Sequence, residues 1–164
     1  MMRLIVMRHA KAVSEAGAGG DHARQLAERG RSDAVLVGRR LVALGWTPDT
    51  VLSSDSARTR ETWERLSEVL PHGLRPTFTR QLYLAGPAEV VDALFEVGDD
   101  ARTLLLLGHN PGWEQLVSGL GGEGVEMPTA CAALLELRGD RPWWQAASTG
   151  GWRLVELIRA KTLR

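Results

Sequence analysis

Residues 4–12 are LIVMRHAKA, four apolar residues followed directly by Arg8 and His9. The apolar residues do not alternate with polar ones, which is typical of a strand buried on both faces of a sheet. A cation beside a titratable ring is costly to bury without a partner. We therefore expect Arg8 and His9 to begin an anion-binding site at the tip of a buried strand.

The rest of the chain alternates apolar runs with segments of helical period. A second buried strand is predicted at 103–107 (TLLLL), and it ends in Gly108-His109. Strands separated by helices indicate an α/β fold, a three-layer α/β/α sandwich with a largely parallel central sheet, and residues 1–164 are expected to form one domain. We predict strands at 3–8, 50–53, 103–107, 132–137 and 152–158, a brief extended piece at 76–79, and helices at about 31–45, 56–70, 87–97 and 111–120.

Composition limits the classes of protein to consider. The 164 residues are 44% hydrophobic and 24% charged, and 20 Lys plus Arg balance 20 Asp plus Glu. This balance argues against bulk attraction to nucleic acid or to a membrane surface. Cys131 is the single cysteine, so no intrachain disulfide and no multi-cysteine metal site is expected. The apolar run before Arg8 is too short for a signal-peptide core or a membrane span, and we expect a cytoplasmic protein.

Histidine and arginine recur where predicted strands end. The strand at 50–53 is followed by Ser54 and, four residues later, by Arg58. In an open α/β sheet, reactive groups gather beyond the carboxyl ends of the strands. If these strands are neighbours, His9, His109, Arg8 and Arg58 converge at one edge of the sheet.

Two guanidinium groups with two imidazoles form a pocket for a phosphoryl group. The planar fork of arginine matches phosphate oxygens bidentately. A neutral imidazole is a competent nucleophile toward phosphorus, and a covalent intermediate divides one difficult displacement into two easier ones. The remaining cations stabilise charge on the equatorial oxygens, so no metal and no cofactor is expected.

Three motifs then identify a family that the chain resembles, the histidine phosphatase (phosphoglycerate mutase-like) superfamily. Further features resemble its SixA-type phosphohistidine phosphatase branch, and the resemblance spans about residues 2–137. The superfamily motifs are Arg8-His9-Ala10, Ser54-xxx-Arg58-xxx-Thr62 and Gly108-His109-Asn110-Pro111; the branch features are the short length, Leu82-Tyr83, His109-Asn110-Pro111-Gly112 and Met127-Pro128-Thr129-Ala130.

The resemblance implies a role for each matching residue. His9 is the nucleophile that becomes phosphorylated, and Arg8, Arg58 and His109 form the phosphate clamp, with His109 protonated when substrate is bound. Arg24 lies where SixA-type members often place a further phosphate-binding arginine. The implied fold is phosphoglycerate mutase-like, and the implied activity is metal-independent hydrolysis through a phosphohistidine intermediate.

The chain departs from the superfamily at two places. Ala10 stands where glycine usually follows the nucleophile, a change that the SixA-type branch tolerates. Larger members use a mid-chain carboxylate as proton donor, but the comparable stretch, 79–83 (TRQLY), contains no acid. Asp21 and Glu89 are conceivable substitutes that the spacing does not select. Since the imidazole of phosphohistidine is easily protonated on leaving, this absence favours phosphohistidine over alkyl phosphates.

Several alternatives stay open at this point. The partner is a phosphorylated protein or a small phosphorylated substrate, and the chain has no room for a large lid between Ser53 and Leu107, which predicts an open, shallow pocket. A small-molecule phosphomonoesterase or mutase on the same scaffold, or a non-catalytic phosphate-binding module, remains possible. We expect His22 and His72 to be solvated, and Trp113 to pack in the core or line the rim of the pocket.

Overall fold

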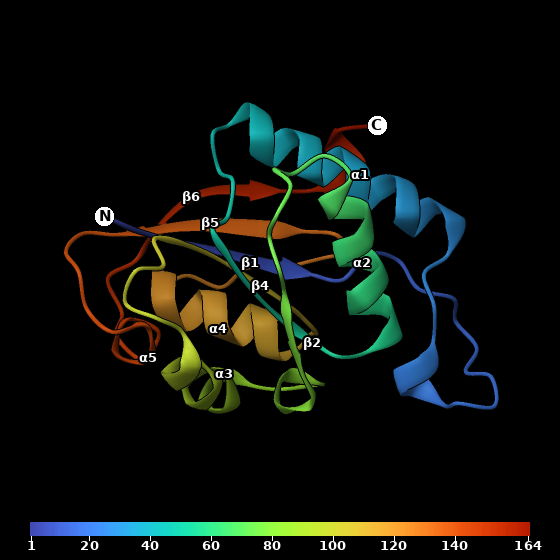
Figure 1. The fold of residues 1–164 in the computed structure, drawn as a ribbon, viewed down its shortest axis with the longest axis horizontal. Helices are drawn as coiled ribbons and strands as arrows, with labels where there is room; N and C mark the ends of the chain where they lie inside the picture. Colours follow the sequence, from blue (N-terminus) through green and yellow to red (C-terminus); the bar gives the residue numbers. More distant parts are fainter.

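One six-stranded sheet organises the chain, which the computed structural model describes over residues 1–164 (Figure 1). The strand order is β3-β2-β4-β1-β5-β6. The pairs β1–β4, β4–β2 and β2–β3 are parallel, whereas β5 is antiparallel to both of its neighbours. Five strands therefore run in one direction, and the predicted largely parallel sheet is confirmed. The strands are β1 (Met2–Arg8), β2 (Thr50–Ser54), β3 (Thr77–Thr79), β4 (Thr103–Gly108), β5 (Ala132–Leu137) and β6 (Arg153–Ile158).

Helices cover both faces of this sheet, as Figure 1 shows, with α1 and α2 on one side and α3, α4 and α5 on the other. The predicted three-layer α/β/α sandwich is thus confirmed. The helices are α1 (Glu28–Ala43), α2 (Ala57–Ser67), α3 (Pro87–Ala93), α4 (Gly112–Gly121) and α5 (Trp143–Ala146), and the 3-10 turns are η1 (Asp21–Ala23), η2 (Arg80–Leu82), η3 (Leu94–Glu96) and η4 (Ala160–Thr162).

The two cores follow from the alternation of side chains along the buried strands. In β1, Leu4 and Val6 belong to the core under α3, α4 and α5, whereas Ile5 and Met7 belong to the core under α1 and α2. All four side chains have no exposed surface. A strand apolar at every position is needed because both faces of the sheet are covered.

Some predicted boundaries were wrong. The helix predicted at 87–97 breaks into α3 and the 3-10 turn η3, and the turn-rich stretch before β6 contains the short helix α5. Burial explains α5: Trp143 is 1% exposed, donates from its indole nitrogen to Ala101 O at 3.0 Å and stacks on Trp152. No helix is long and apolar enough to cross a membrane.

The parallel strands bring the predicted site residues to one edge. Arg8 at the end of β1 pairs with Gly108 at the end of β4, and Ser53 of β2 pairs with Leu107. Since β4 lies between β1 and β2, the residues that follow these three strands are neighbours. In Figure 1 the arrowhead of β1 points toward the side of the molecule that carries η1.

Candidate active site

His9 lies immediately beyond β1 and is 6% exposed. Its Nδ1 is 2.7 Å from Ala10 O, a carbonyl that only accepts, so Nδ1 carries the ring proton. The lone pair is therefore on Nε2, which accepts a hydrogen bond from Nε of Arg58 at 3.3 Å. This tautomer directs the Nε2 electron pair toward the arginine that would hold an incoming phosphoryl group.

Arg58 is 2% exposed and lies in the first turn of α2. The helix begins here because the Ser56 side chain accepts the backbone N–H of Thr59 as an N-cap. One turn later Thr62 accepts the backbone N–H of Ala10 at 3.0 Å and donates to Arg58 O at 2.7 Å. Thr62 thereby fixes the helix that carries Arg58 against the loop that carries His9.

His109 follows β4, and its ring centroid lies 5.4 Å from that of His9. Its Nδ1 is 3.3 Å from Nη2 of Arg58, which can only donate, so Nδ1 accepts. Its Nε2 therefore carries the proton and donates to Ser54 Oγ at 2.8 Å. Of the four residues predicted to converge, Arg58 contacts both His9 and His109 directly.

Both imidazoles are neutral in this arrangement. Burial, partly opposed by the hydrogen bond to Ala10 O and reinforced by nearby arginines, lowers the pKa of His9 to about 4. Burial, with the adjacent His9 and Arg58, lowers the pKa of His109 to about 3. His109 is thus unprotonated near neutral pH, and an anion bound beside it would raise its pKa toward the protonated form.

Arg8, the last residue of β1, is the remaining member of the predicted clamp. Its Nη1 donates to Met127 O at 3.1 Å, whereas its Nε is buried without a hydrogen-bond partner. Burial also lowers its pKa, although a guanidinium remains charged at neutral pH. A buried, unpaired N–H on a permanent cation is suited to bind an anion that arrives from outside.

Asp21, at the start of η1, lies over the clamp. Its backbone oxygen accepts from Nη1 of Arg58 at 2.9 Å, and its carboxylate is 3.2 Å from Nη2. The same carboxylate accepts the hydroxyl of Tyr83. The Tyr83 hydrogen bond, then those of Arg24 and Arg58, hold the pKa of Asp21 well below its usual range. Asp21 is therefore an anion and not a proton donor.

Arg24 does not touch either histidine. Its Nε donates to the Asp21 carboxylate at 2.9 Å, and its Nη1 donates to Val13 O at 2.7 Å. Its charge is nevertheless among those that lower the pKa of His9. Arg24 thus lies at the rim of the site, bound to the residue that covers the clamp.

Tyr83 and His22 belong to the site but were not predicted there. The Tyr83 ring stands edge-on to His109 and to His22, with centroids 5.4 and 4.8 Å away. His22, which was expected to be solvated, is partly exposed, and its Nε2 also lies 2.7 Å from the Asp55 carboxylate. Leu82-Tyr83 in the branch motif was the available signal for Tyr83.

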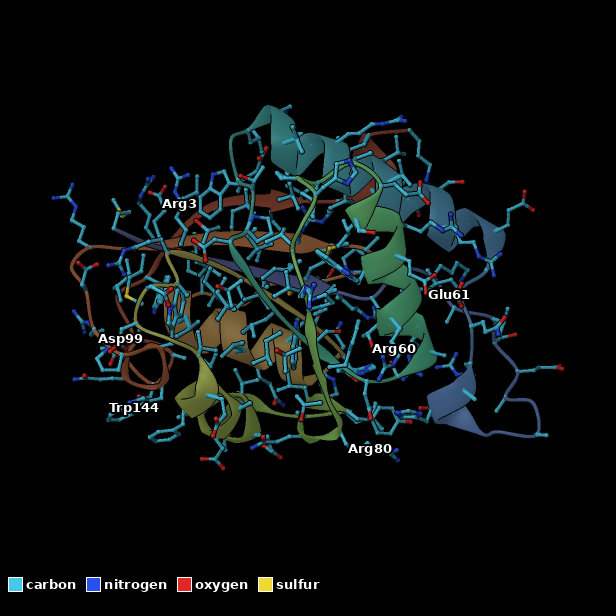
Figure 2. The ribbon with its side chains drawn as sticks, in the orientation of Figure 1. Arg3, Arg60, Glu61, Arg80, Asp99 and Trp144 are labelled. Atoms are coloured by element: carbon cyan, nitrogen blue, oxygen red, sulfur yellow. The ribbon has the colours of Figure 1, made fainter.

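The rim is basic around Tyr83. The guanidinium of Arg80 lies 4.9 Å from the Tyr83 ring centroid, and Figure 2 shows Arg60 at the end of α2 that begins the helix and Arg80 farther down, at the lower edge of the view. Arg60 stacks on Phe78 of β3 at 4.2 Å. Asp21 lies against Arg58 and Tyr83 lies against His109, and His9 is 6% exposed, so the nucleophile is less accessible than the expected open, shallow pocket implies.

No carboxylate replaces the missing mid-chain acid. Residues 80–82 form the 3-10 turn η2, and Glu89 is exposed on α3 without a contact to the clamp. Nor does the structure contain a group of three or more His, Cys, Asp or Glu side chains that could hold a metal ion. The arrangement provides a neutral imidazole nucleophile, three nearby guanidinium groups and a second neutral imidazole.

Comparison with known proteins relates this sequence to one family of phosphatases. Residues 4–82 match the family model of the histidine phosphatase superfamily (branch 1). An uncharacterised chloroplastic protein of Arabidopsis thaliana is 35% identical over 169 residues, covering 95% of this chain and 77% of that protein. An uncharacterised protein of Mycobacterium leprae is 30% identical over 152 residues, covering 85% of this chain and 90% of the other.

Solved structures agree. A candidate phosphohistidine phosphatase SixA from Agrobacterium tumefaciens is 26% identical, with a TM-score of 0.80 over 96% of this chain and 97% of that one. Two others share the fold: the protein histidine phosphatase SixA complexed with tungstate (TM-score 0.83, 20% identity, 99% and 100% covered) and a mycobacterial glucosyl-3-phosphoglycerate phosphatase (TM-score 0.66, 19% identity, 94% and 97% covered).

Proposed function

Because the chain belongs to the histidine phosphatase superfamily, in its SixA-type branch, and is a phosphatase, we propose that it hydrolyses phosphohistidine on proteins through a phosphorylated His9. The observation that carries this proposal is the tautomer of His9, whose Nδ1 is fixed by Ala10 O and whose Nε2 faces Arg58. A neutral buried imidazole with its lone pair on the phosphate side is the nucleophile that the reaction requires.

In the first step the Nε2 lone pair of His9 attacks phosphorus and forms a P–N bond. The bond between phosphorus and the substrate imidazole breaks, its electron pair stays on the leaving nitrogen, and that nitrogen takes a proton from water. In the second step water attacks phosphorus, the bond to His9 breaks, and orthophosphate leaves as the water proton passes to solvent. His9 returns to its starting tautomer.

The cations around His9 act on the transferring group. Arg8 offers its unpaired Nε–H, and Arg58 offers the N–H groups that Asp21 holds in the free protein. His109 lies beside Arg58, and a bound phosphoryl dianion raises the pKa of His109 so that it takes up a proton. Arg24 also binds the phosphoryl group once the Asp21 carboxylate has left Arg58. Preorganised donors of this kind stabilise the charge of the transition state without reorganisation.

Two features favour phosphohistidine as the substrate. An ionised Asp21 and an exposed, distant Glu89 leave the site without a carboxylic acid to protonate an alkoxide. An imidazole leaving group accepts its proton readily near neutral pH. The phosphorylated partner is then a protein. Residues 1–164 form the catalytic domain. Its single cysteine, Cys131, is buried and unpaired, which agrees with a cytoplasmic setting.

A second candidate is a phosphatase or mutase for small phosphate esters. Its support is the shared fold of the glucosyl-3-phosphoglycerate phosphatase and the burial of His9, which restricts access to the nucleophile. A non-catalytic phosphate-binding module would keep the clamp without turnover.

One experiment separates these candidates. The protein is incubated with a histidine-phosphorylated protein, with phosphoserine and with p-nitrophenyl phosphate, each with and without chelator, beside His9→Ala. His72→Ala is the matched control, because His72 is an exposed histidine outside the site. We expect chelator-resistant release of phosphate from phosphohistidine, lost in His9→Ala only, and an acid-labile, base-stable phosphoryl adduct on His9.

Other outcomes would contradict the proposal. Activity that survives His9→Ala, or that requires a divalent metal, excludes the mechanism. Turnover of the esters with none of phosphohistidine keeps the mechanism but overturns the substrate. Phosphate binding without an adduct on His9 indicates the binding module.

A further inference from the structure

A cavity of about 430 Å³ lies beside the clamp and shares Arg8 with it. We call it the Arg8 cavity. Its volume is in the range of ligand sites. The other cavities of the molecule are lined by residues that do not belong to the site. Besides Arg8, its lining includes Asn110, Glu114, Glu126, Met127 and Arg159.

The backbone of Met127 holds the inner wall of the Arg8 cavity in place. Met127 O accepts from both Arg8 Nη1, at 3.1 Å, and Asn110 Nδ2, at 2.8 Å. The N–H of Met127 donates to Glu114 Oε2 at 2.7 Å. The wall is therefore preformed, and it connects the cavity directly to the phosphate clamp.

Three groups of the lining are unpaired. Asn110 Oδ1 is buried without a hydrogen-bond partner, which leaves an acceptor that a ligand can satisfy. The side chains of Glu126 and Arg159 are exposed and form no hydrogen bond or ion pair within the chain. Contacts within the chain thus hold the inner wall in place, but they leave these three groups free to bind a ligand.

Their charges indicate what fits. A phosphoryl group on the clamp neutralises Arg8, and the lining then carries the carboxylates Glu114 and Glu126 against the single cation Arg159. With Asn110 Oδ1 as a further acceptor, this surface suits a cation rich in N–H donors. A substrate carboxylate beside the phosphoryl group, as in small acidic phosphate esters, would be repelled by the carboxylates of Glu114 and Glu126.

We propose that the Arg8 cavity binds a basic side chain of the phosphoprotein substrate, which pairs with Glu126 and donates to Asn110 Oδ1 while the phosphoryl group lies on the clamp. This inference rests on the proposed function and adds a determinant of specificity to it. It assigns to Glu126 a role in choosing the substrate and none in the chemical step.

The test uses histidine-phosphorylated peptides that differ at one position, within two residues of phosphohistidine, where Lys, Ala or Glu is placed. We expect kcat/KM for the best lysine peptide to exceed that for its alanine counterpart by about three- to fivefold, the contribution of one partly exposed ion pair. Glu126→Gln should abolish this preference, and Glu126→Lys should reverse it toward the glutamate peptide. Glu123→Gln, an exposed acid of the same loop outside the cavity lining, should retain the preference.

Failure of the subsite and failure of the proposed function give different results. Equal hydrolysis of all three peptides, a preference for glutamate, or a lysine preference that Glu126→Gln leaves intact overturns the subsite while phosphohistidine hydrolysis stands. If no peptide is hydrolysed while a small phosphomonoester is, the proposed function fails and the subsite with it. Thermal unfolding of both glutamine variants checks that they fold alike.

Discussion

The carboxylate of Asp21 lies 3.2 Å from Nη2 of Arg58 and, with its own backbone oxygen, occupies two nitrogens of that guanidinium. These are the groups that a phosphate would bind. The hydrogen bond from Tyr83, with further ones from Arg24 and Arg58, keeps the pKa of Asp21 well below its usual range, so this anion is present throughout the neutral pH range. Asp21 therefore competes with phosphate for Arg58.

This competition predicts that Asp21→Asn binds orthophosphate more tightly. Removing the charge frees Arg58, and we expect the inhibition constant for orthophosphate to fall about two- to fivefold, as for a partly exposed ion pair. Inhibition by phosphate, measured at pH 6 and pH 8, checks this. Glu15→Gln removes the same charge at an exposed position of the preceding loop and should leave the constant unchanged. Weaker inhibition in Asp21→Asn would show that Asp21 supports phosphate binding.

The lowered pKa values of His9 and His109 predict a loss of stability on acidification. Both histidines are neutral in the folded protein down to pH of about 4 and 3, but in the unfolded chain they bind protons near pH 6.5. The unfolded state thus binds more protons between these values, so the free energy of unfolding rises with pH in this window and falls as pH drops from about 6.5 toward 4.

The slope is expected to reach about 1.4 kcal/mol per pH unit for each imidazole. Urea unfolding of the wild type and of His109→Gln at pH 7, 6 and 5 measures it. In His109→Gln the slope of unfolding free energy against pH should be smaller by the contribution of one imidazole. Replacing the exposed His72 by Gln should leave the slope unchanged. Parallel curves for wild type and His109→Gln would contradict the assignment of a neutral buried His109.

The hydrogen bonds of Thr62 predict that one substitution lowers both the stability of the protein and the rate of His9 phosphorylation. Thr62→Val leaves the backbone N–H of Ala10 without its acceptor, which costs about 1–3 kcal/mol of unfolding free energy. It also frees Arg58 and His9 to shift relative to each other, so phosphorylation of His9 should slow about tenfold or more. Urea unfolding and the rate of adduct formation test the two effects. Thr62→Ser retains the hydroxyl and should restore the rate; a rate as low as that of Thr62→Val would exclude this role for the hydroxyl.

The strand tips could be predicted from the sequence because buried strands have a strong local signal. The continuous apolar runs before Arg8 and Gly108 indicate two-sided burial, and the parallel sheet then requires His9 and His109 to lie at one edge. Arg58 follows from the same rule, since it lies in the first turn of the helix after β2.

The cover of the site could not be predicted in the same way. Asp21 lies in an irregular loop and Tyr83 follows a single 3-10 turn, so neither is placed by a hydrophobic period. Their contact joins residues 62 positions apart, and it depends on how two loops fold over a finished sheet. The partner of His22 was missed for the same reason, because Asp55 is 33 positions away.

Two glycines of α4 give a matched pair of stability predictions. A Cβ on Gly112 would lie 1.8 Å from the backbone oxygen of Ala85, so Gly112→Ala must displace the start of α4 and with it the loop that carries His109. We expect a loss of at least about 1–3 kcal/mol of unfolding free energy and a fall in activity. A Cβ on Gly119, in the same helix, meets no atom within 4 Å, and Gly119→Ala should stabilise the protein by about 0.5–1 kcal/mol with activity unchanged. Urea unfolding of both variants, with phosphatase assays, decides the matter: equal effects at the two positions would mean that Ala85 does not constrain the helix that begins beside His109.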